Sequence, residues 1–202
     1  MIAIVDYSVG NLFSLKSSLS AIGYDAVITG EAEVIRKSDK IFLPGVGAFG
    51  DAISKLRSTG LDKVIIEEAK NGKPLFGICL GMQMLFDKSY EFGEYDGLGL
   101  VSGDVVPLKG VINDNLKIPH IGWNGLSITA DSPIFKYIDN GDCVYFVHSY
   151  YATNCDKSVI ATSEYSIPVT AAVQNGNVFG TQFHPEKSGK VGLDILKAFC
   201  EM

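Results

Sequence analysis

The chain has 202 residues, a length that favours one domain. Its 17 Lys and Arg against 23 Asp and Glu give a net charge of −6, which argues against nucleic acid or an acidic membrane as a partner. No apolar run reaches the roughly 18 residues of a membrane helix, and the first residues lack the features of a signal peptide. We therefore expect a cytoplasmic protein whose four cysteines are reduced thiols and hold no zinc.

Strands alternate with amphipathic helices over the first half of the chain. Short apolar runs predict strands, and apolar residues at every third or fourth position predict helices. The strands are expected at residues 2–7, 25–29, 40–43 and 75–78, and the helices at residues 11–22, 31–37, 48–57, 61–70 and 80–87. This alternation predicts an α/β fold with a mixed, largely parallel central sheet and helices on both faces.

The second half changes character after about Gly97. Short apolar runs separated by Gly, Pro, Asn and Asp predict the strands of a smaller antiparallel portion. They cover residues 98–106, 118–128, 143–151, 159–162, 169–174 and 178–183, and a final helix is expected at residues 191–200. Because no repeat or linker interrupts the chain, we expect residues 1–202 to form a single domain.

A cysteine stands at a predicted strand-to-helix junction, in Gly77-Ile78-Cys79-Leu80-Gly81. The pattern is typical of a nucleophile elbow, whose sharp turn requires small neighbours. The N-terminus of the following helix favours a thiolate, and the Leu80 N–H is placed to face an oxyanion. The alternative is a buried cysteine between two glycines. The other cysteines lack this context and are expected to have no catalytic role: Cys143, Cys155 and Cys200.

A candidate base follows the last predicted strand, in Gln182-Phe183-His184-Pro185-Glu186. In an extended chain, residues i and i+2 lie on the same side. Glu186 can therefore hold one ring nitrogen of His184 and leave the other facing the Cys79 thiol. Such pairs also arise by chance, so the assignment depends on finding the pair and the elbow in one chain.

The turn Pro44-Gly45-Val46-Gly47 follows the strand predicted at residues 40–43. Glycines here allow the backbone to approach a ligand and to direct an N–H at an oxyanion, although an ordinary strand-to-helix turn would look similar. We expect an oxyanion hole formed by Gly45, Val46, Gly47 and Leu80. We also expect the peptide after Gly45 or after Val46 to be turned away until a partner's ligand binds.

These three features, in this order, resemble the class I (triad) glutamine amidotransferases over nearly the whole chain. Cys79, His184 and Glu186 match the catalytic triad of that family, and the Pro44–Gly47 turn matches its oxyanion strand. One departure is Ser8, where the family often has glycine, so the loop there is expected to be adjusted. A closer resemblance to one branch of the family comes from Asp6-Tyr7, Gly10–Leu12, Gly77–Gln83, Pro119–Asn124, Tyr145–Tyr150 and Gln182–Ser188.

The resemblance implies that Cys79 attacks the side-chain carboxamide of L-glutamine while His184 moves the protons. It implies a heterodimer in which ammonia passes to a cyclase subunit of (βα)₈-barrel fold, with no metal or organic cofactor in the glutaminase half. Four residues are implied to bind glutamine: Gln83, Glu91 as counter-charge to the α-ammonium, and the backbone of Ser149 and Tyr150. Glu91 could instead be a solvated acid, and Gln83 a surface amide.

Partner contacts are expected on one side of this site. Trp123, the only tryptophan, is expected to be exposed at the interface, with a core position as the alternative. The resemblance places Asn11 and Lys187 near the same interface, where Lys187 could form an ion pair. His120 is either an interface residue or a core histidine, and His148 is expected to be structural.

Two other functions stay open from the sequence. A triad glutaminase could serve a different synthase, for example a sugar-amidating one that also pairs with a barrel. A regulatory homologue without turnover is disfavoured, because Cys79, His184, Glu186 and Gln83 are all present.

Overall fold

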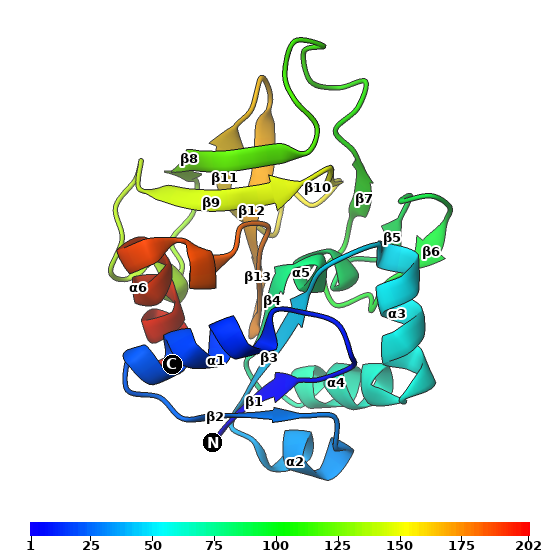
Figure 1. The fold of residues 1–202 in the computed structure, drawn as a ribbon, viewed down its shortest axis with the longest axis vertical. Helices are drawn as coiled ribbons and strands as arrows, with labels where there is room; N and C mark the ends of the chain where they lie inside the picture. Colours follow the sequence, from blue (N-terminus) through cyan, green and yellow to red (C-terminus); the bar gives the residue numbers. More distant parts are fainter.

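The computed structural model describes all of residues 1–202, and its main feature is a nine-stranded mixed sheet (Figure 1). The strand order is β2-β1-β3-β4-β13-β12-β11-β8-β9, parallel from β2 to β13 and antiparallel from β13 to β9. A second sheet has the order β10-β7-β5-β6. No helix is long and apolar enough to cross a membrane.

The strands of the first half are β1 (Ile2–Val5), β2 (Ala26–Thr29), β3 (Lys40–Gly45) and β4 (Leu75–Cys79). Those of the second half are β5 (Lys88–Ser89), β6 (Tyr95–Asp96), β7 (Asp104–Pro107), β8 (His120–Ile128), β9 (Cys143–His148), β10 (Tyr150–Thr153), β11 (Val159–Glu164), β12 (Pro168–Asn175) and β13 (Val178–Thr181). The helices are α1 (Leu12–Ala21), α2 (Ala32–Lys37), α3 (Phe49–Ser58), α4 (Leu61–Lys70), α5 (Leu80–Met84) and α6 (Gly189–Cys200), with 3-10 turns η1 (Pro133–Phe135) and η2 (Pro185–Lys187).

Helices cover both faces of the parallel strands (Figure 1). Successive side chains of a strand point to opposite faces. On β1, Ala3 and Val5 pack in the core shared with α2, α3 and α4, whereas Ile2 and Ile4 pack in the core shared with α1 and α6. Because both faces are buried, these strands are continuous apolar runs, which made them easy to predict.

Three neighbouring parallel strands bring distant parts of the chain to one edge of the sheet. β4 lies between β3 and β13, with Gly45 opposite Cys79 and Thr181 opposite Ile78. The carboxyl ends of all three strands therefore lie side by side, which is where ligands bind in open α/β sheets. The glycine turn after β3, the cysteine ending β4 and the histidine after β13 are gathered there by topology.

The predicted fold class is confirmed, but the helix predicted at residues 80–87 ends at Met84. Backbone N–H groups of the next loop donate to the last carbonyls instead: Leu98 N to Met84 O at 2.8 Å and Leu100 N to Leu85 O at 2.8 Å. Because these residues bond to the end of the helix, the first residues of the strand predicted at 98–106 do not pair in a sheet. The strand therefore begins only at Asp104.

The single strand predicted at residues 143–151 is two strands in two sheets. β9 pairs with β8 in the large sheet, and β10 pairs with β7 in the small one. The chain passes between the sheets at Ser149, which no sequence pattern marks. This crossing point lies beside the carboxyl edge of the parallel strands, in the wall of the cavity described next.

Candidate active site

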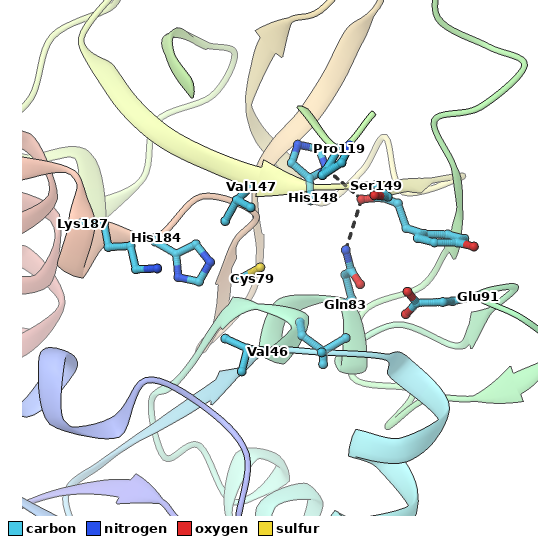
Figure 2. A pocket seen from close by; sticks show the side chains of 13 residues that line it. Val46, Cys79, Gln83, Glu91, Pro119, Val147, His148, Ser149, His184 and Lys187 are labelled. Carbon is cyan, nitrogen blue, oxygen red and sulfur yellow. Dashed lines mark hydrogen bonds between the residues drawn. The ribbon is translucent and has the colours of Figure 1, made fainter. Parts of the chain in front are cut away.

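A cavity of about 370 Å³ opens at the carboxyl edge of the sheet (Figure 2). It contains the candidate nucleophile and base together with all four residues expected to bind substrate. The lining residues are Val46, Gly47, Cys79, Leu80, Gln83, Glu91, Pro119, Val147, His148, Ser149, Tyr150, His184 and Lys187. Glu186 is the one residue of the expected triad that does not line the cavity.

Cys79 occupies a strained turn between β4 and α5. Its φ of 54° and ψ of −111° are unusual for a residue with a side chain. The turn depends on its glycines, since a Cβ on Gly81 would lie 1.7 Å from the Leu43 carbonyl oxygen. The first N–H groups of a helix have no intrahelical acceptor, so α5, although only five residues long, directs the Leu80 end at the sulfur.

We expect Gly81→Ala to destabilise the fold by about 3 kcal/mol or more, because the new methyl group has no space beside the β3 backbone. Urea unfolding measures this change. Gly72→Ala is a suitable control, because no atom lies within 4 Å of its added Cβ and only its positive φ carries a cost. An equal and small loss in both variants would contradict the steric origin.

His184 and Glu186 form a buried pair beside the cysteine. His184 Nδ1 lies 2.8 Å from Glu186 Oε1, and both side chains are 3% exposed. The geometry differs from the extended chain expected, because Pro185–Lys187 forms one 3-10 turn. His184 is held by its own N–H, which donates to Tyr145 O on β9 at 3.0 Å, and by its carbonyl, which accepts from the Ser188 hydroxyl at 2.6 Å.

The charges of the triad favour a protonated histidine. Burial alone would lower the pKa of His184, but its hydrogen bonds and charge interactions with Cys79 and Glu186 raise that pKa to about 10. At neutral pH the ring is therefore an imidazolium between a sulfur and a carboxylate. A protonated His184 beside Cys79 is an arrangement that can activate a thiol nucleophile. Glu186 Oε2 is buried without a hydrogen-bond partner.

The glycine turn is anchored by Tyr7, a residue that the sequence did not single out for the site. The Tyr7 hydroxyl donates to Pro44 O at 2.8 Å, and a Cβ on Gly45 would lie 2.9 Å from that hydroxyl. Burial and the nearby Cys79 raise the pKa of Tyr7. Val46 is 41% exposed, and Gly47 has a φ of 93°. The oxyanion hole stays a prediction, and so does a resting state in which the peptide after Gly45 or Val46 is turned away.

Ser8 keeps a positive φ of 67° just after β1. Glycine adopts this conformation without cost, whereas for serine it costs about 1 kcal/mol. The Ser8 N–H donates to Asp6 Oδ1 at 2.9 Å, which holds the turn. Serine is therefore accommodated here in a backbone conformation that glycine favours.

Gln83 is buried rather than at the surface, and it leads to a second residue that the sequence analysis missed. Gln83 Nε2 donates to Gln182 Oε1 at 2.9 Å and to Tyr150 O at 3.2 Å. Gln182 Nε2 in turn lies 3.8 Å from Cys79 Sγ. The two amides thus connect Cys79 to the opposite wall of the cavity. Figure 2 shows the part of this connection that Gln83 makes. A glutamine just before the candidate base was the only signal for Gln182.

Glu91 lies across the cavity from the triad (Figure 2). It is half-buried, and its Oε2 accepts a 2.7 Å hydrogen bond from the Phe49 N–H at the start of α3. Burial raises the pKa of Glu91, and the bond from Phe49 partly offsets this. Ser149 and Tyr150 line the same end. Contacts of Gln83, Glu91, Ser149 and Tyr150 with substrate stay predictions.

Of the three expected interface residues, Lys187 lines the cavity. Trp123 is 55% exposed, so the core alternative is wrong, and its ring approaches Gly189, two residues after Lys187. Lys187 is exposed and forms no ion pair. Asn11 precedes α1, which packs against η2. Their contact with a partner stays a prediction.

The remaining cysteines and histidines lie outside the triad. Cys155 and Cys200 are buried, whereas Cys143 is exposed at the start of β9, and all four cysteines are free. His120 is 1% exposed, which makes it a core histidine. His148 lines the cavity and is 5% exposed. No group of three or more acidic, His or Cys side chains could hold a metal ion.

Comparison with known proteins identifies the family of the chain. The family model "Glutamine amidotransferase class-I" matches residues 3–201. The "Imidazole glycerol phosphate synthase subunit HisH" of Caldanaerobacter subterraneus subsp. tengcongensis is 51% identical over 203 residues, covering 100% of this chain and 98% of the relative. The protein of that name from Lactococcus lactis is 48% identical over 201 residues, covering 99% and 98%.

Solved structures show the same fold at low identity. A crystal structure of a glutamine amidotransferase has a TM-score of 0.77 at 19% identity, covering 100% of this chain and 98% of that one. The structure of PurLQS from Thermotoga maritima has a TM-score of 0.76 at 21% identity, covering 99% and 97%. The predicted fold and enzyme class are thus confirmed, and the chain belongs to the class I glutamine amidotransferase family.

Proposed function

We propose that the chain is the glutaminase subunit of imidazole glycerol phosphate synthase, a lyase of histidine biosynthesis. The observation that carries this proposal is 51% and 46% identity, over the whole chain, to relatives with that name. Residues 1–202 act as one domain in the cytoplasm and supply ammonia to a cyclase subunit of (βα)₈-barrel fold. That subunit makes imidazole glycerol phosphate and an aminoimidazole carboxamide ribotide.

The first half of the reaction forms a thioester. The Cys79 thiolate attacks the carboxamide carbon of glutamine, and the carbonyl electrons move to oxygen, next to the Gly45–Gly47 turn and the Leu80 N–H. The raised pKa of His184, about 10, supports a ring that already carries the proton. His184 gives this proton to the amide nitrogen, the C–N bond breaks, and ammonia leaves a glutamyl thioester on Cys79.

The second half hydrolyses the thioester. His184, now neutral, accepts a proton from water while the water oxygen attacks the thioester carbon. Collapse of the second tetrahedral intermediate expels the Cys79 thiolate and releases glutamate. The starting ion pair is thereby restored, and the carboxylate of Glu186, 2.8 Å from the ring, keeps the imidazole oriented throughout.

Substrate glutamine spans the cavity between the triad and Glu91. The Glu91 carboxylate is a counter-charge for the α-ammonium, and the Ser149 and Tyr150 backbone contacts the α-carboxylate. Supporting this assignment, the residues line a cavity of about 370 Å³, close to the lower end of small-ligand pockets.

The cyclase docks over the mouth of the cavity. An exposed apolar strand face supports this position. Ile121 and Trp123 are two residues apart on β8, so their side chains lie on the same face, and they are 59% and 55% exposed. Lys187 lines the same cavity and is exposed, and Asn11 precedes α1, which packs against the turn that contains Lys187. A partner seated there covers the exit through which ammonia must leave. Ammonia then passes directly to the cyclase.

The decisive experiment measures glutamate formation by the purified chain alone, and then with the cyclase and a substrate analogue of the cyclase. We expect low activity alone and a rise of at least about tenfold with both, because the partner's ligand completes the oxyanion hole. Full activity of the isolated chain would contradict a gated subunit. Stimulation only by a different barrel synthase would assign the chain to that synthase.

A further inference from the structure

Two buried histidines beside the cavity take no part in the triad. His120 on β8 and His148 on β9 are opposite each other in the antiparallel register. They are 1% and 5% exposed, and His120 Nδ1 lies 3.0 Å from His148 Nε2. Buried polar groups need hydrogen-bond partners, so each nitrogen of the pair can be assigned a role.

Both outer nitrogens of the pair face oxygen acceptors. His148 Nδ1 lies 2.8 Å from the Tyr150 carbonyl, and His120 Nε2 lies 2.9 Å from Asn124 Oδ1. The Asn124 amide cannot be turned around, because its Nδ2 donates to the Glu164 carbonyl at 3.1 Å and the turned amide would oppose two oxygens. Each outer nitrogen must therefore carry a hydrogen.

The proton count then leaves the central contact unsatisfied. Two neutral imidazoles carry one hydrogen each, and both are used at the ends. The 3.0 Å contact between His120 Nδ1 and His148 Nε2 would join two lone pairs. We propose that His120 and His148 share a third proton and form a single buried cation, which positions the Ser149–Tyr150 backbone and favours a carboxylate in the cavity.

The immediate surroundings favour a cation. The His120 ring is stacked between two aromatic faces, Phe146 at 4.9 Å and 18° and Tyr165 at 3.9 Å and 19°. Aromatic faces are negative, and they stabilise a planar cation stacked on them. Tyr165 is itself fixed, since its hydroxyl donates to the Lys117 carbonyl at 2.8 Å.

The surroundings of the pair oppose two separately charged rings, and the single shared proton is required by the geometry of the three contacts. Burial lowers the pKa of His120, and burial together with repulsion from His120 and His184 lowers the pKa of His148 to about 4. The two rings are therefore not charged together.

The remaining ionisable neighbours do not change this assignment. Glu164 contributes only its carbonyl to the network, because its side chain is exposed. Glu91 lines the far end of the same cavity, and Lys187 lines its mouth and is exposed to solvent. The pair is thus the only buried cation that we assign outside the triad.

The pair acts on substrate through one carbonyl. Tyr150 O accepts from His148 Nδ1 at 2.8 Å and from Gln83 Nε2 at 3.2 Å (Figure 2). These two bonds fix the peptide that lines the cavity where β9 passes into β10. His120 and His148 are therefore positioning residues, and their charge favours substrates with a free α-carboxylate. This last step depends on the function proposed above.

The shared proton is tested on the purified chain by ¹⁵N NMR of labelled histidine near neutral pH, with signals assigned through His120→Gln, His148→Gln and His184→Gln. We expect at most one of the four ring nitrogens of His120 and His148 to show the shift of a deprotonated nitrogen, because three protons occupy the pair. Two deprotonated nitrogens, the count of a neutral pair, would overturn the proposal. Glutamine is not needed, so this result stands whatever the chain hydrolyses.

The positioning role is tested in the complex with the cyclase by Asn124→Leu, which removes the acceptor that requires the third proton. We expect the KM for glutamine to rise by about tenfold while kcat stays within about twofold. The KM of the unmodified protein should rise with pH as the pair loses its proton, and that rise should be absent in Asn124→Leu. A purely structural role would raise KM equally at every pH.

Asn140→Leu is the matched control, because Asn140 also binds β8, through Ile128 N at 2.8 Å, and does not contact the pair. It should leave KM and its pH dependence unchanged. An unchanged KM in Asn124→Leu would overturn the role in substrate positioning. Failure of the unmodified complex to hydrolyse glutamine would refute the proposed function. The shared proton would still be tested independently by the NMR measurement.

Discussion

Replacement of Cys79 by alanine is expected to lower kcat for glutamine hydrolysis by at least about 10⁴-fold, because the thioester cannot form without the sulfur. No other thiol can take its place, since Cys155 and Cys200 are buried away from the cavity and Cys143 lies at the exposed start of β9. The measurement is glutamate released by the complex with the cyclase.

Two controls separate the loss of chemistry from the loss of structure. Cys143→Ala should keep full activity, and a glutamine-like electrophile should label Cys79 alone. In the complex of Cys79→Ala with the cyclase, added ammonium should still support formation of the cyclase products, because only the source of ammonia is lost. Labelling that persists in Cys79→Ala would contradict the assignment of the nucleophile.

The grouping of Cys79, His184 and Glu186 at one site was predictable because the signals of these residues are local. The glycines around Cys79 are required by a turn of five residues, and the His184–Glu186 pair is separated by a single proline. The physical reason given for the pair was only partly right, since a 3-10 turn rather than an extended chain brings Glu186 to the ring. The contact between His184 and Glu186 was therefore predicted correctly, although the backbone conformation predicted for it was wrong.

Residues that reach the site through long-range pairing were not predicted. Gln182 contacts Cys79 only because β13 inserts beside β4, and Tyr7 reaches the glycine turn only because β1 pairs with β3. Parallel pairing leaves no short-range signal at either residue. The contact between His120 and His148 likewise depends on the β8–β9 register.

Element ends were missed where tertiary contacts override local propensity. The residues after Met84 are apolar and favour a helix, yet Leu98 and Leu100 donate to the carbonyls that a longer helix would have used. Ser149 shows the same effect in a strand, because its neighbours bond to two different sheets. Ser149 lines the cavity, and Met84 directly follows the lining residue Gln83, so both errors fall close to the site.

Replacement of Glu186 by glutamine is expected to lower kcat by about 10²-fold or more, because the imidazolium loses its counter-charge and its orientation. Interactions with Cys79 and Glu186 raise the pKa of His184 to about 10. Removing the carboxylate lowers that pKa, so the ring loses its proton at a lower pH. We therefore expect the alkaline limb of the kcat profile, expected near pH 10 in the unmodified protein, to move to lower pH.

The same substitution makes a prediction about stability, with a sign fixed by the direction of the shift. The pKa of His184 is about 10 in the folded state and about 6.5 in the unfolded state, so protonation of His184 stabilises the fold. This contribution to stability is fully present below the unfolded pKa and is lost as pH rises through the folded pKa. Urea unfolding should show this loss between neutral pH and about pH 10, and Glu186→Gln should weaken the dependence.

Glu164→Gln is the matched control, because that side chain is exposed and contributes only its backbone carbonyl to the histidine network. It should leave the alkaline limb and the stability profile in place. An unmoved alkaline limb in Glu186→Gln would show that Cys79 alone holds the proton on His184. In that case the unpartnered Oε2 of Glu186 would mark a carboxylate that orients the ring without supplying its charge.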